Sequence, residues 1–505
     1  MGNAAGLWGL ISILVLTILI GAYSRNVSRT TSDFYVASRA ARPWWNASAI
    51  GGEYLASASY LGVAGLIAVA GQDALLIPLG YTAGFLLLLM FVAAPLRRSN
   101  AYTLPDFAQS RFGSMGLRRI TAIASIMICG TYVVPQLHGA ALTVQVTTEL
   151  PGWTGSAAVA AVVCLTVVTG GMRSITFVQA IQFWFKVAAL AFPLAFMLFA
   201  IMGREDGLAE VGTAFEHLPG DSGETSPYRT ASLLTALVLG TIGLPHVLAR
   251  FYTSPDGSSA RRTGTIVLCL VGGFYLLPIS YGILGRAFRP AIGQSDADAL
   301  VLILPERLLE GVTGLVLSAV VAAGAFSAFL ATTSGLIVAL AAVVSQEFFH
   351  SDVAGFQWAA VISGAGTLTV SLFTSSVSLV ETVALVFAFS ASTIFPMLIL
   401  GIWWRRLTPM GAAAGMICGG FLVVSALVAH TIIGNTAVFM PAVSALLAQP
   451  AAWTVPTSFL IMIAVSLRDG PMDPARVERF LRQIHRPDFE ALPANRHRKR
   501  DNTWN

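Results

Sequence analysis

The stretch N-A-S-A-I-G-G-E-Y-L-A-S-A-S-Y-L-G-V-A-G, residues 46–65, decides how the rest of this chain is interpreted. It lies in an apolar run long enough to cross a bilayer, yet twelve of its twenty residues are Gly, Ala or Ser. Gly51 and Gly52 stand in its middle, followed by the ionisable Glu53. Glycine weakens a helix, and a backbone carbonyl freed inside a membrane is tolerated only where it lines a cavity or binds something. The stretch therefore predicts a binding helix broken near the membrane midplane, or alternatively a small-residue helix that packs tightly against its neighbours.

The composition is that of an all-α polytopic membrane protein. Of the 505 residues, 55% are hydrophobic and 11% are charged, which is more apolar surface than a soluble domain could bury. The net charge of +5 reflects loop charges that orient such a chain and does not indicate nucleic-acid binding. The four cysteines lie in apolar runs and lack the spacing of a disulfide framework or a metal cluster. The sequence contains no Gly-rich phosphate loop and no soluble catalytic domain, which argues against an ATP-driven pump or an enzyme.

About thirteen apolar windows of roughly 20 residues predict transmembrane helices. The first window lacks a basic n-region, so we interpret it as a retained span and not as a cleaved signal peptide. The windows are 7–24, 45–70, 74–96, 120–147, 155–170, 175–202, 230–250, 263–285, 311–345, 355–374, 379–404, 411–431 and 449–467.

The basic residues predict the orientation of these spans. With the amino terminus outside, 24 of the 30 lysines and arginines fall in cytoplasmic segments, five in outside loops, and Lys186 within a span. Cytoplasmic loops are enriched in Lys and Arg, so this distribution predicts an N-out/C-in topology. The acidic outside segment 203–229 is expected to include a short surface helix. In the tail, 477–484 fits an amphipathic helix and the basic run 496–500 fits attraction to anionic lipid; the alternative is a disordered, solvated tail.

The ninth predicted span could face the broken helix with hydroxyl groups. Ala328 and Thr332 are one helical turn apart and share a face, and Thr333 and Ser334 add hydroxyls beside them. Two carbonyls from a broken helix and a hydroxyl from a facing helix form an oxygen cage of the kind that hard cations prefer. The alternative is that these hydroxyls bond back to their own helix.

Several motifs carry a family resemblance over nearly all of residues 7–467. The chain resembles the sodium:solute symporter family, most closely its cation/acetate (monocarboxylate) branch, and the G-L-P-H-x-L-x-R-F pattern is the most specific match. The matching pieces are S-D-F-Y-V-A-S-R at 32–39, G-E-Y-L-A-S-A-S-Y-L-G at 52–62, T-L-P-D-F at 103–107, G-G-M-R-S at 170–174, G-L-P-H-V-L-A-R-F-Y-T at 243–253 and F-P-x-x-x-x-G-x-W-W-R-R-L-T at 395–408.

The resemblance implies a LeuT-type five-plus-five inverted repeat from the second to the eleventh span. The predicted topology agrees, because five is odd and a second copy must enter the membrane from the opposite side. The expected segments are 1–44 (first span and cytoplasmic loop), 45–202 (first repeat), 203–229 (outside loop), 230–404 (second repeat), 405–467 (two further spans) and 468–505 (cytoplasmic basic tail).

The resemblance also implies a sodium site, with one departure. The implied ligands are the carbonyls of Gly52 and Leu55 together with Ala328, Ala331 and Thr332. Where relatives commonly carry a Ser-Ser or Ser-Thr pair, this chain has Ala331-Thr332, so one hydroxyl is missing. Thr333 could compensate, but it points about 100° away around the helix.

Two polar residues of the sixth span are interpreted together. Gln179 stands where proline and sugar relatives carry an aspartate, which disfavours an additional bound sodium and suits a substrate that brings its own negative charge. Lys186 lies two turns further on the same face, roughly 18 Å into the span at 1.5 Å per residue. An ammonium at that depth is either paired with a structural carboxylate or snorkelling, or it is a counter-ion for the substrate or a titratable group that partly replaces the cation.

The remaining candidates lie near prolines and at the breaks. We interpret His138 and His246, each close to a proline, as hydrogen-bonded residues rather than proton carriers. We interpret Glu53 as tuning the cation site rather than forming an ordinary ion pair. The seventh span is expected to break beside Pro245. The residues expected to bind substrate are Glu53, Ala56, Ser57, Gln179, Lys186, Thr241 and Gly243.

The expected function is secondary active uptake of a short monocarboxylate such as acetate, propionate or pyruvate, with sodium or protons, by alternating access. The expected partners are the solute, the coupling cation and the lipid of a bacterial plasma membrane, with no other cofactor. One alternative is a symporter for another small solute such as proline or a sugar. A second is a transporter-like membrane sensor, which is expected to carry a fused signalling domain that the short tail after Leu467 does not provide.

Overall fold

The computed structural model describes residues 2–24, 30–204, 207–216, 227–288, 294–349, 352–374, 379–433 and 441–486. These residues are overwhelmingly helical and include no strand. The elements are α1 (Gly2–Ser24), α2 (Thr31–Val36), η2 (Ala37–Arg39), α3 (Pro43–Tyr54), η3 (Ala58–Gly62), α4 (Val63–Ala70), η4 (Gly71–Leu75), α5 (Leu76–Phe91), α6 (Ala93–Arg98), α7 (Leu104–Phe112), α8 (Met115–Thr147), α9 (Trp153–Met202), α10 (Gly207–Glu216), α11 (Pro227–Gly243), α12 (Pro245–Tyr252), α13 (Gly257–Phe288), η5 (Gln294–Ala299), α14 (Leu300–Leu308), α15 (Gly311–Phe348), α16 (Val353–Phe373), α17 (Leu379–Ser392), α18 (Ile394–Trp403), α19 (Pro409–Ile433), α20 (Pro441–Ala448), α21 (Ala451–Arg468) and α22 (Pro474–His485).

Eleven helical stretches among the described residues are long and apolar enough to cross a membrane. Two of them, Ala58–Phe91 and Trp153–Met202, each contain parts of two of the thirteen predicted spans. Both contain a break at a glycine with positive φ: Gly71 has φ 69°, and Gly171 has φ 56° and ψ −162°, a combination open to glycine alone. A side chain at Gly171 would also collide with Phe34 of α2. The membrane character is thereby confirmed, while the number of spans stays a prediction.

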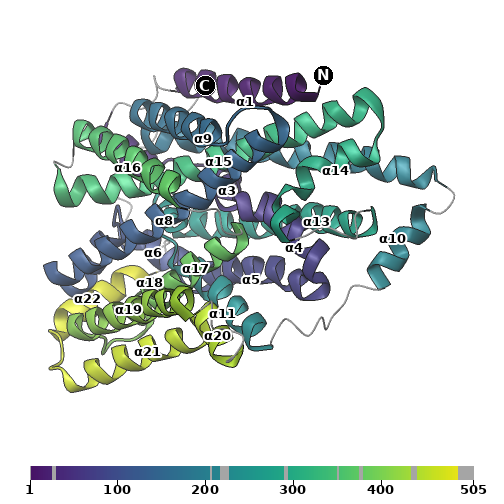
Figure 1. The fold of residues 1–505 in the computed structure, drawn as a ribbon. Helices are drawn as coiled ribbons and strands as arrows, with labels where there is room; N and C mark the ends of the chain where they lie inside the picture. Colours follow the sequence, from purple (N-terminus) through teal and green to yellow (C-terminus); the bar gives the residue numbers. More distant parts are fainter. Residues whose placement is uncertain are drawn as a thin grey trace.

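The helices differ in how deeply they lie within the bundle. Figure 1 shows α1 along one edge and α19, α20 and α21 along the opposite edge, with α3 and α15 between them. In the most apolar window of α15, 78% of residues are buried, against 28% in that of α1. Figure 1 also places α10 and the amino-terminal end of α1 at one end of the bundle, and α22 at the other. The site is therefore to be sought along α15 and the helices that pack on it, α9, α8 and α3.

Two short helices lie outside the apolar stretches. The predicted surface helix within 203–229 is present as α10. The predicted amphipathic helix at 477–484 is present as α22, which buries its apolar face against the bundle, with the ring of Phe480 5.7 Å from that of Phe107 in α7. This part of the tail is thus not the solvated segment of the alternative interpretation. The basic run 496–500 lies outside the described residues.

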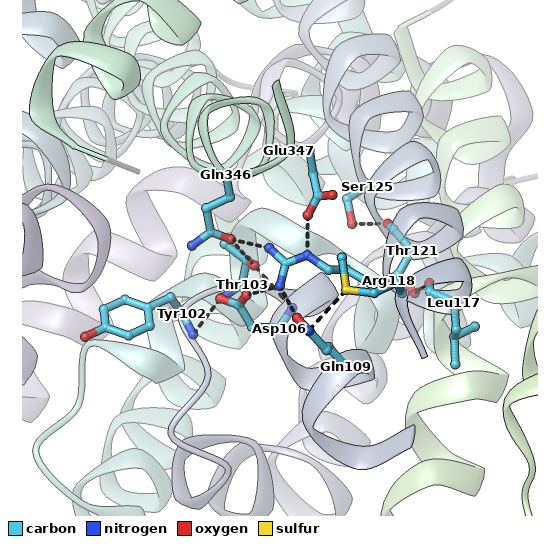
Figure 2. A network of polar contacts seen from close by, with 11 residues as sticks. Tyr102, Thr103, Asp106, Gln109, Leu117, Arg118, Thr121, Ser125, Gln346 and Glu347 are labelled. Atoms are coloured by element: carbon cyan, nitrogen blue, oxygen red, sulfur yellow. Dashed lines mark hydrogen bonds and ion pairs between the residues drawn. The ribbon is translucent and has the colours of Figure 1, made fainter. Parts of the chain in front are cut away.

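A polar network at the α22 end ties three helices together (Figure 2). Arg118, near the start of α8, donates to Glu347 at the end of α15 at 2.6 Å and to Asp106 of α7 at 2.7 Å. It also donates to the side-chain oxygen of Gln109 in α7 at 2.5 Å. Asp106 is itself fixed by the capping box that it forms with Thr103 at the start of α7. One guanidinium therefore holds the ends of α7, α8 and α15 in one arrangement.

We expect Arg118→Met to loosen this end of the bundle. The substitution leaves two largely buried carboxylates without their shared partner, and hydrogen bonds to charged groups contribute about 1.5–3 kcal/mol each. The melting temperature of the purified protein in detergent should fall. Arg119→Met removes the neighbouring charge, which forms no ion pair with the residues that the structure describes, and serves as the matched control. Equal melting temperatures for the two variants would contradict a structural role for the network.

Candidate functional site

The helix that begins at Pro43 is broken, as predicted, but the break lies three residues beyond the Gly51–Gly52 pair on which the prediction rested. α3 ends at Tyr54, and Leu55 takes the non-helical angles φ −78° and ψ 82°. The N–H of Ala56, which a continuing helix would direct to the carbonyl of Gly52, donates instead to the carbonyl of Tyr54 at 2.9 Å. The chain then resumes as η3 and α4. The carbonyls of Gly52 and Leu55 are thus available to other groups in the middle of the bundle.

Lys186 of α9 donates hydrogen bonds to both of those carbonyls. Its Nζ donates to the oxygens of Gly52 and Leu55, each at 2.7 Å, and the side chain is fully buried. Within the described residues the ammonium makes no ion pair with a carboxylate. The interpretation of Lys186 as paired with a structural carboxylate or snorkelling is therefore wrong.

A buried ion pair stands beside this lysine. Nε of Arg250, in α12, donates to Oε2 of Glu53 at 2.6 Å, and both side chains are 1% exposed. Arg250 also donates to the hydroxyl of Thr176 at 2.7 Å and to the side-chain oxygen of Gln179. The amide of Gln179 donates in turn to the carbonyl of Ala331 at 2.6 Å. The interpretation of Glu53 as something other than an ion-pair partner is thus wrong, because its charge is matched by Arg250.

The three neighbouring hydroxyls of α15, those of Thr332, Thr333 and Ser334, differ in their hydrogen-bond partners. Thr332 Oγ1 donates across to the carbonyl of Glu53 at 2.7 Å. Ser334 bonds back to the carbonyl of Leu330 at 2.6 Å, as the alternative interpretation had it. Thr333 Oγ1 is buried and has no hydrogen-bond partner in the described structure, so its compensation for the missing hydroxyl at Ala331 stays a prediction.

The predicted sodium ligands are therefore brought together, but they do not fit a sodium ion. Gly52 and Leu55 on α3 meet α15 through the bond from Thr332, and Ala328 lies one turn before Thr332 on the same helix. The two free carbonyls, however, already accept from the ammonium of Lys186. A second cation at the same two oxygens would stand in contact with a like charge.

The second broken span lies on the other side of the site. α11 ends at Gly243 and α12 begins at Pro245, as predicted. Thr241 Oγ1 lies 2.9 Å from the hydroxyl of Tyr54, so it meets the end of α3 but not the cluster around Lys186. A side chain at Gly243 would collide with Ser390 of α17, which shows that this glycine permits close helix packing. Among the described residues, Thr241 and Gly243 form no hydrogen bond with Arg250 or Lys186.

One face of α8 contacts both breaks. The N–H of Ser57, which follows Ala56 at the first break, donates to the side-chain oxygen of Gln136 at 2.9 Å. One turn earlier on α8, the ring of Tyr132 lies 5.4 Å from that of His246 at the second break. The hydroxyl of Ser57 and both ring nitrogens of His246 are buried without a partner among the described residues. The predicted hydrogen bond is present for His138, to the carbonyl of Ser371 at 3.1 Å, and absent for His246 in the described structure.

A cavity of about 220 Å³ reaches the cluster from the side predicted to be cytoplasmic. It is lined by η2 and the starts of α3 and of the second half of α9, including Trp45 and Arg173. Thr176 also lines it, and the same hydroxyl accepts from Arg250. The Thr176 side chain thus lies between this cavity and the Glu53–Arg250 pair.

Sequence reasoning counted Arg250 among the cytoplasmic charges, whereas the structure buries it in an ion pair with Glu53. Sequence reasoning also did not single out Gln136 or Tyr132. Arg250 is the arginine of the G-L-P-H-V-L-A-R-F stretch, and its apolar neighbours could have indicated that it is buried. An arginine buried among them needs a carboxylate partner, and Glu53 is the carboxylate of the other broken helix. Gln136 and Tyr132 lie in an ordinary apolar helix, where no local pattern marks them.

Two discontinuous helices that meet at the middle of a helical bundle define a class of protein, the LeuT-type secondary transporters. Residues 34–419 match the sodium:solute symporter family, and the chain belongs to that family. The family assignment made from the motifs is thereby confirmed. The chain is a multi-pass membrane transporter and not an enzyme.

Known relatives agree with this assignment. The chain is 29% identical over 481 residues to the uncharacterized symporter YwcA of Bacillus subtilis strain 168, covering 89% of this chain and 91% of that protein. The fold resembles that of a Na⁺-coupled sialic acid symporter in a substrate-bound outward-open state, with a TM-score of 0.74, 12% identity and coverage of 93% and 98%. It also resembles Mhp1, a nucleobase-cation-symport-1 family transporter in a closed conformation, with a TM-score of 0.57, 12% identity and coverage of 89% and 98%.

Proposed function

We propose that this symporter takes up a short monocarboxylate, such as acetate, propionate or pyruvate, with a coupling cation, sodium or a proton, by alternating access. The observation that carries the proposal is the pair of buried, unpartnered groups at the two helix breaks, the Ser57 hydroxyl and the His246 imidazole. Buried polar groups are normally hydrogen-bonded, so groups left without a partner at a transport site favour a ligand that supplies one. A carboxylate accepts hydrogen bonds from both a hydroxyl and an imidazole N–H.

The charge of the site supports an anionic solute. Glu53 and Arg250 neutralise each other, and the Lys186 ammonium has only carbonyl partners in the described structure. The cluster therefore has an excess of one positive charge in a region where water is scarce, and a monoanion balances it. A substrate without net charge, such as proline or a sugar, does not.

The size of the site supports a small solute. The His246 ring packs on that of Tyr132 at 5.4 Å, Tyr132 packs on Phe387 at 5.9 Å, and Tyr81 packs on Phe387 at 5.3 Å. We infer that this aromatic packing beside His246 favours a small solute over one with many heavy atoms. A carboxylate with one or two further carbons fits this environment best.

Counterflow in proteoliposomes tests the proposal. Vesicles loaded with unlabelled acetate, propionate or pyruvate should accumulate the same labelled solute, whereas vesicles loaded with proline or glucose should not. The measurement is repeated with and without sodium and with and without an inward proton gradient. Accumulation of proline or glucose, with none of any monocarboxylate, would contradict the proposed substrate class.

We expect Ser57→Ala to raise the KM for the monocarboxylate by roughly tenfold or more, because a hydrogen bond to a charged group contributes about 1.5–3 kcal/mol. The Ser57 hydroxyl has no partner in the described structure, so its loss should leave the melting temperature unchanged. Ser334→Ala removes a buried hydroxyl that bonds to its own helix and serves as the control. An unchanged KM in Ser57→Ala would remove this hydroxyl from the substrate site.

A further inference from the structure

The ammonium of Lys186 stands where the family resemblance places two of the ligands of a sodium ion. Its Nζ lies 2.7 Å from the oxygens of both Gly52 and Leu55, and no part of the side chain is exposed. A sodium ion bound by the same two oxygens would need the same volume. It would also lie in contact with a fixed positive charge, which repels it most strongly where water is excluded.

The backbone at this point requires a cation or a donor. α3 ends at Tyr54, so the negative end of its dipole and its last carbonyls point at Lys186. Within a membrane, carbonyls that leave a helix must be satisfied inside the protein. An ammonium has three donors, and two of them satisfy these carbonyls in every molecule without an ion from solution.

The other expected sodium ligands are also less suited to a sodium ion than the family resemblance implies. Thr332 Oγ1 donates to the carbonyl of Glu53, and the carbonyl of Ala331 accepts from Gln179. Ala331 itself supplies a methyl group where a second hydroxyl is expected. Two oxygens of the expected sodium site therefore bind the lysine, and the remaining expected ligands are bonded elsewhere or lack a hydroxyl.

We propose that the Lys186 ammonium is a built-in cation that takes the place of sodium between α3 and α15. Solute uptake then requires no sodium ion at this position. The inference rests on the proposed function where uptake is measured, but sodium binding can be measured whatever the solute is.

Binding of radioactive sodium to the purified full-length protein in detergent is the central test. The wild type should show no saturable sodium binding that depends on Thr332. Lys186→Ala opens the space between the carbonyls and should bind sodium about tenfold or more tightly than the wild type. Adding Thr332→Ala to that variant should abolish the gain. Lys186→Met is the matched control, because its apolar chain fills the space without offering a charge or a vacancy, and it should gain no sodium binding.

Uptake provides the second readout. Wild-type proteoliposomes should accumulate the monocarboxylate within about twofold of the same rate when choline replaces sodium, whereas any uptake by Lys186→Ala should depend on sodium. Wild-type sodium binding that Thr332→Ala removes would overturn the proposal. So would equal sodium binding by Lys186→Ala and Lys186→Met. If Lys186→Ala does not fold, the comparison of the wild type with Thr332→Ala decides alone. Failure of monocarboxylate uptake with the expected sodium binding would reject the proposed solute and leave this inference standing.

Discussion

Arg250→Met should be among the most damaging single substitutions in the chain. It removes one partner of a fully buried ion pair and leaves the Glu53 carboxylate without a counter-charge, at a cost of about 3–5 kcal/mol. It also removes the bonds from Arg250 to Thr176 and Gln179. The expected result is a large fall in melting temperature and in the amount of protein recovered from the membrane, together with loss of uptake.

The double variant Glu53→Gln/Arg250→Met separates charge from packing. Both charges are then absent, so no uncompensated ion remains buried, and the melting temperature should recover most of its loss. Uptake should stay low, because the bond network that orders the break is gone. A double variant as unstable as Arg250→Met alone would show that packing of the arginine, and not its charge, stabilises the site.

Gly52→Ala should abolish uptake although it adds a single methyl group. A Cβ at this position would lie 2.5 Å from the backbone oxygen of Gln179, and a backbone atom of a long helix cannot move aside cheaply. α3 and α9 would have to separate at the point where Lys186 reaches the carbonyl of Gly52. Uptake should fall by more than about tenfold, while the protein remains in the membrane.

Gly130→Ala is the matched control for this substitution. Gly130 lies inside α8, and a Cβ there would meet nothing within 4 Å. Replacing an unhindered helical glycine by alanine stabilises a helix by about 0.5–1 kcal/mol, so this variant should keep full uptake. Full uptake in Gly52→Ala as well would mean that α3 and α9 do not need their close approach.

Much of the fold and part of the site follow from local patterns. Apolar windows predicted the membrane helices, and the Gly51–Gly52 pair predicted a broken helix, because both depend on composition over a few residues. The break itself lies at Leu55, three residues beyond that pair, and both glycines are helical. Gln179 and Lys186 were predicted on one face of one helix. Lys186 does reach the broken segment, whereas Gln179 bonds to Ala331 of α15 and to Arg250 of α12. The number of spans, the orientation and the roles of the individual site residues remain predictions.

The partners of buried charges could not be predicted in the same way. The Glu53–Arg250 pair joins residues 197 positions apart, and only the packing of α12 against α3 brings them together. Whether Lys186 bonds to a carboxylate, to water or to carbonyls depends on which backbone groups are left free at the helix break. The composition of the sequence does not specify those groups. His246 keeps its nitrogens unpartnered among the described residues because an aromatic ring, not an acceptor, faces it.

The tail helix α22 has a consequence for handling the protein. Arg476 of α22 donates to the backbone oxygen of Gln109 at 3.4 Å, and the Gln109 side chain belongs to the network of Arg118. A binder that recognises α22 only in this docked position therefore stabilises the contact of α22 with α7, whose Gln109 side chain Arg118 also binds. An antibody fragment against the docked helix would therefore stabilise this conformation by binding α22, which is not part of the proposed solute site.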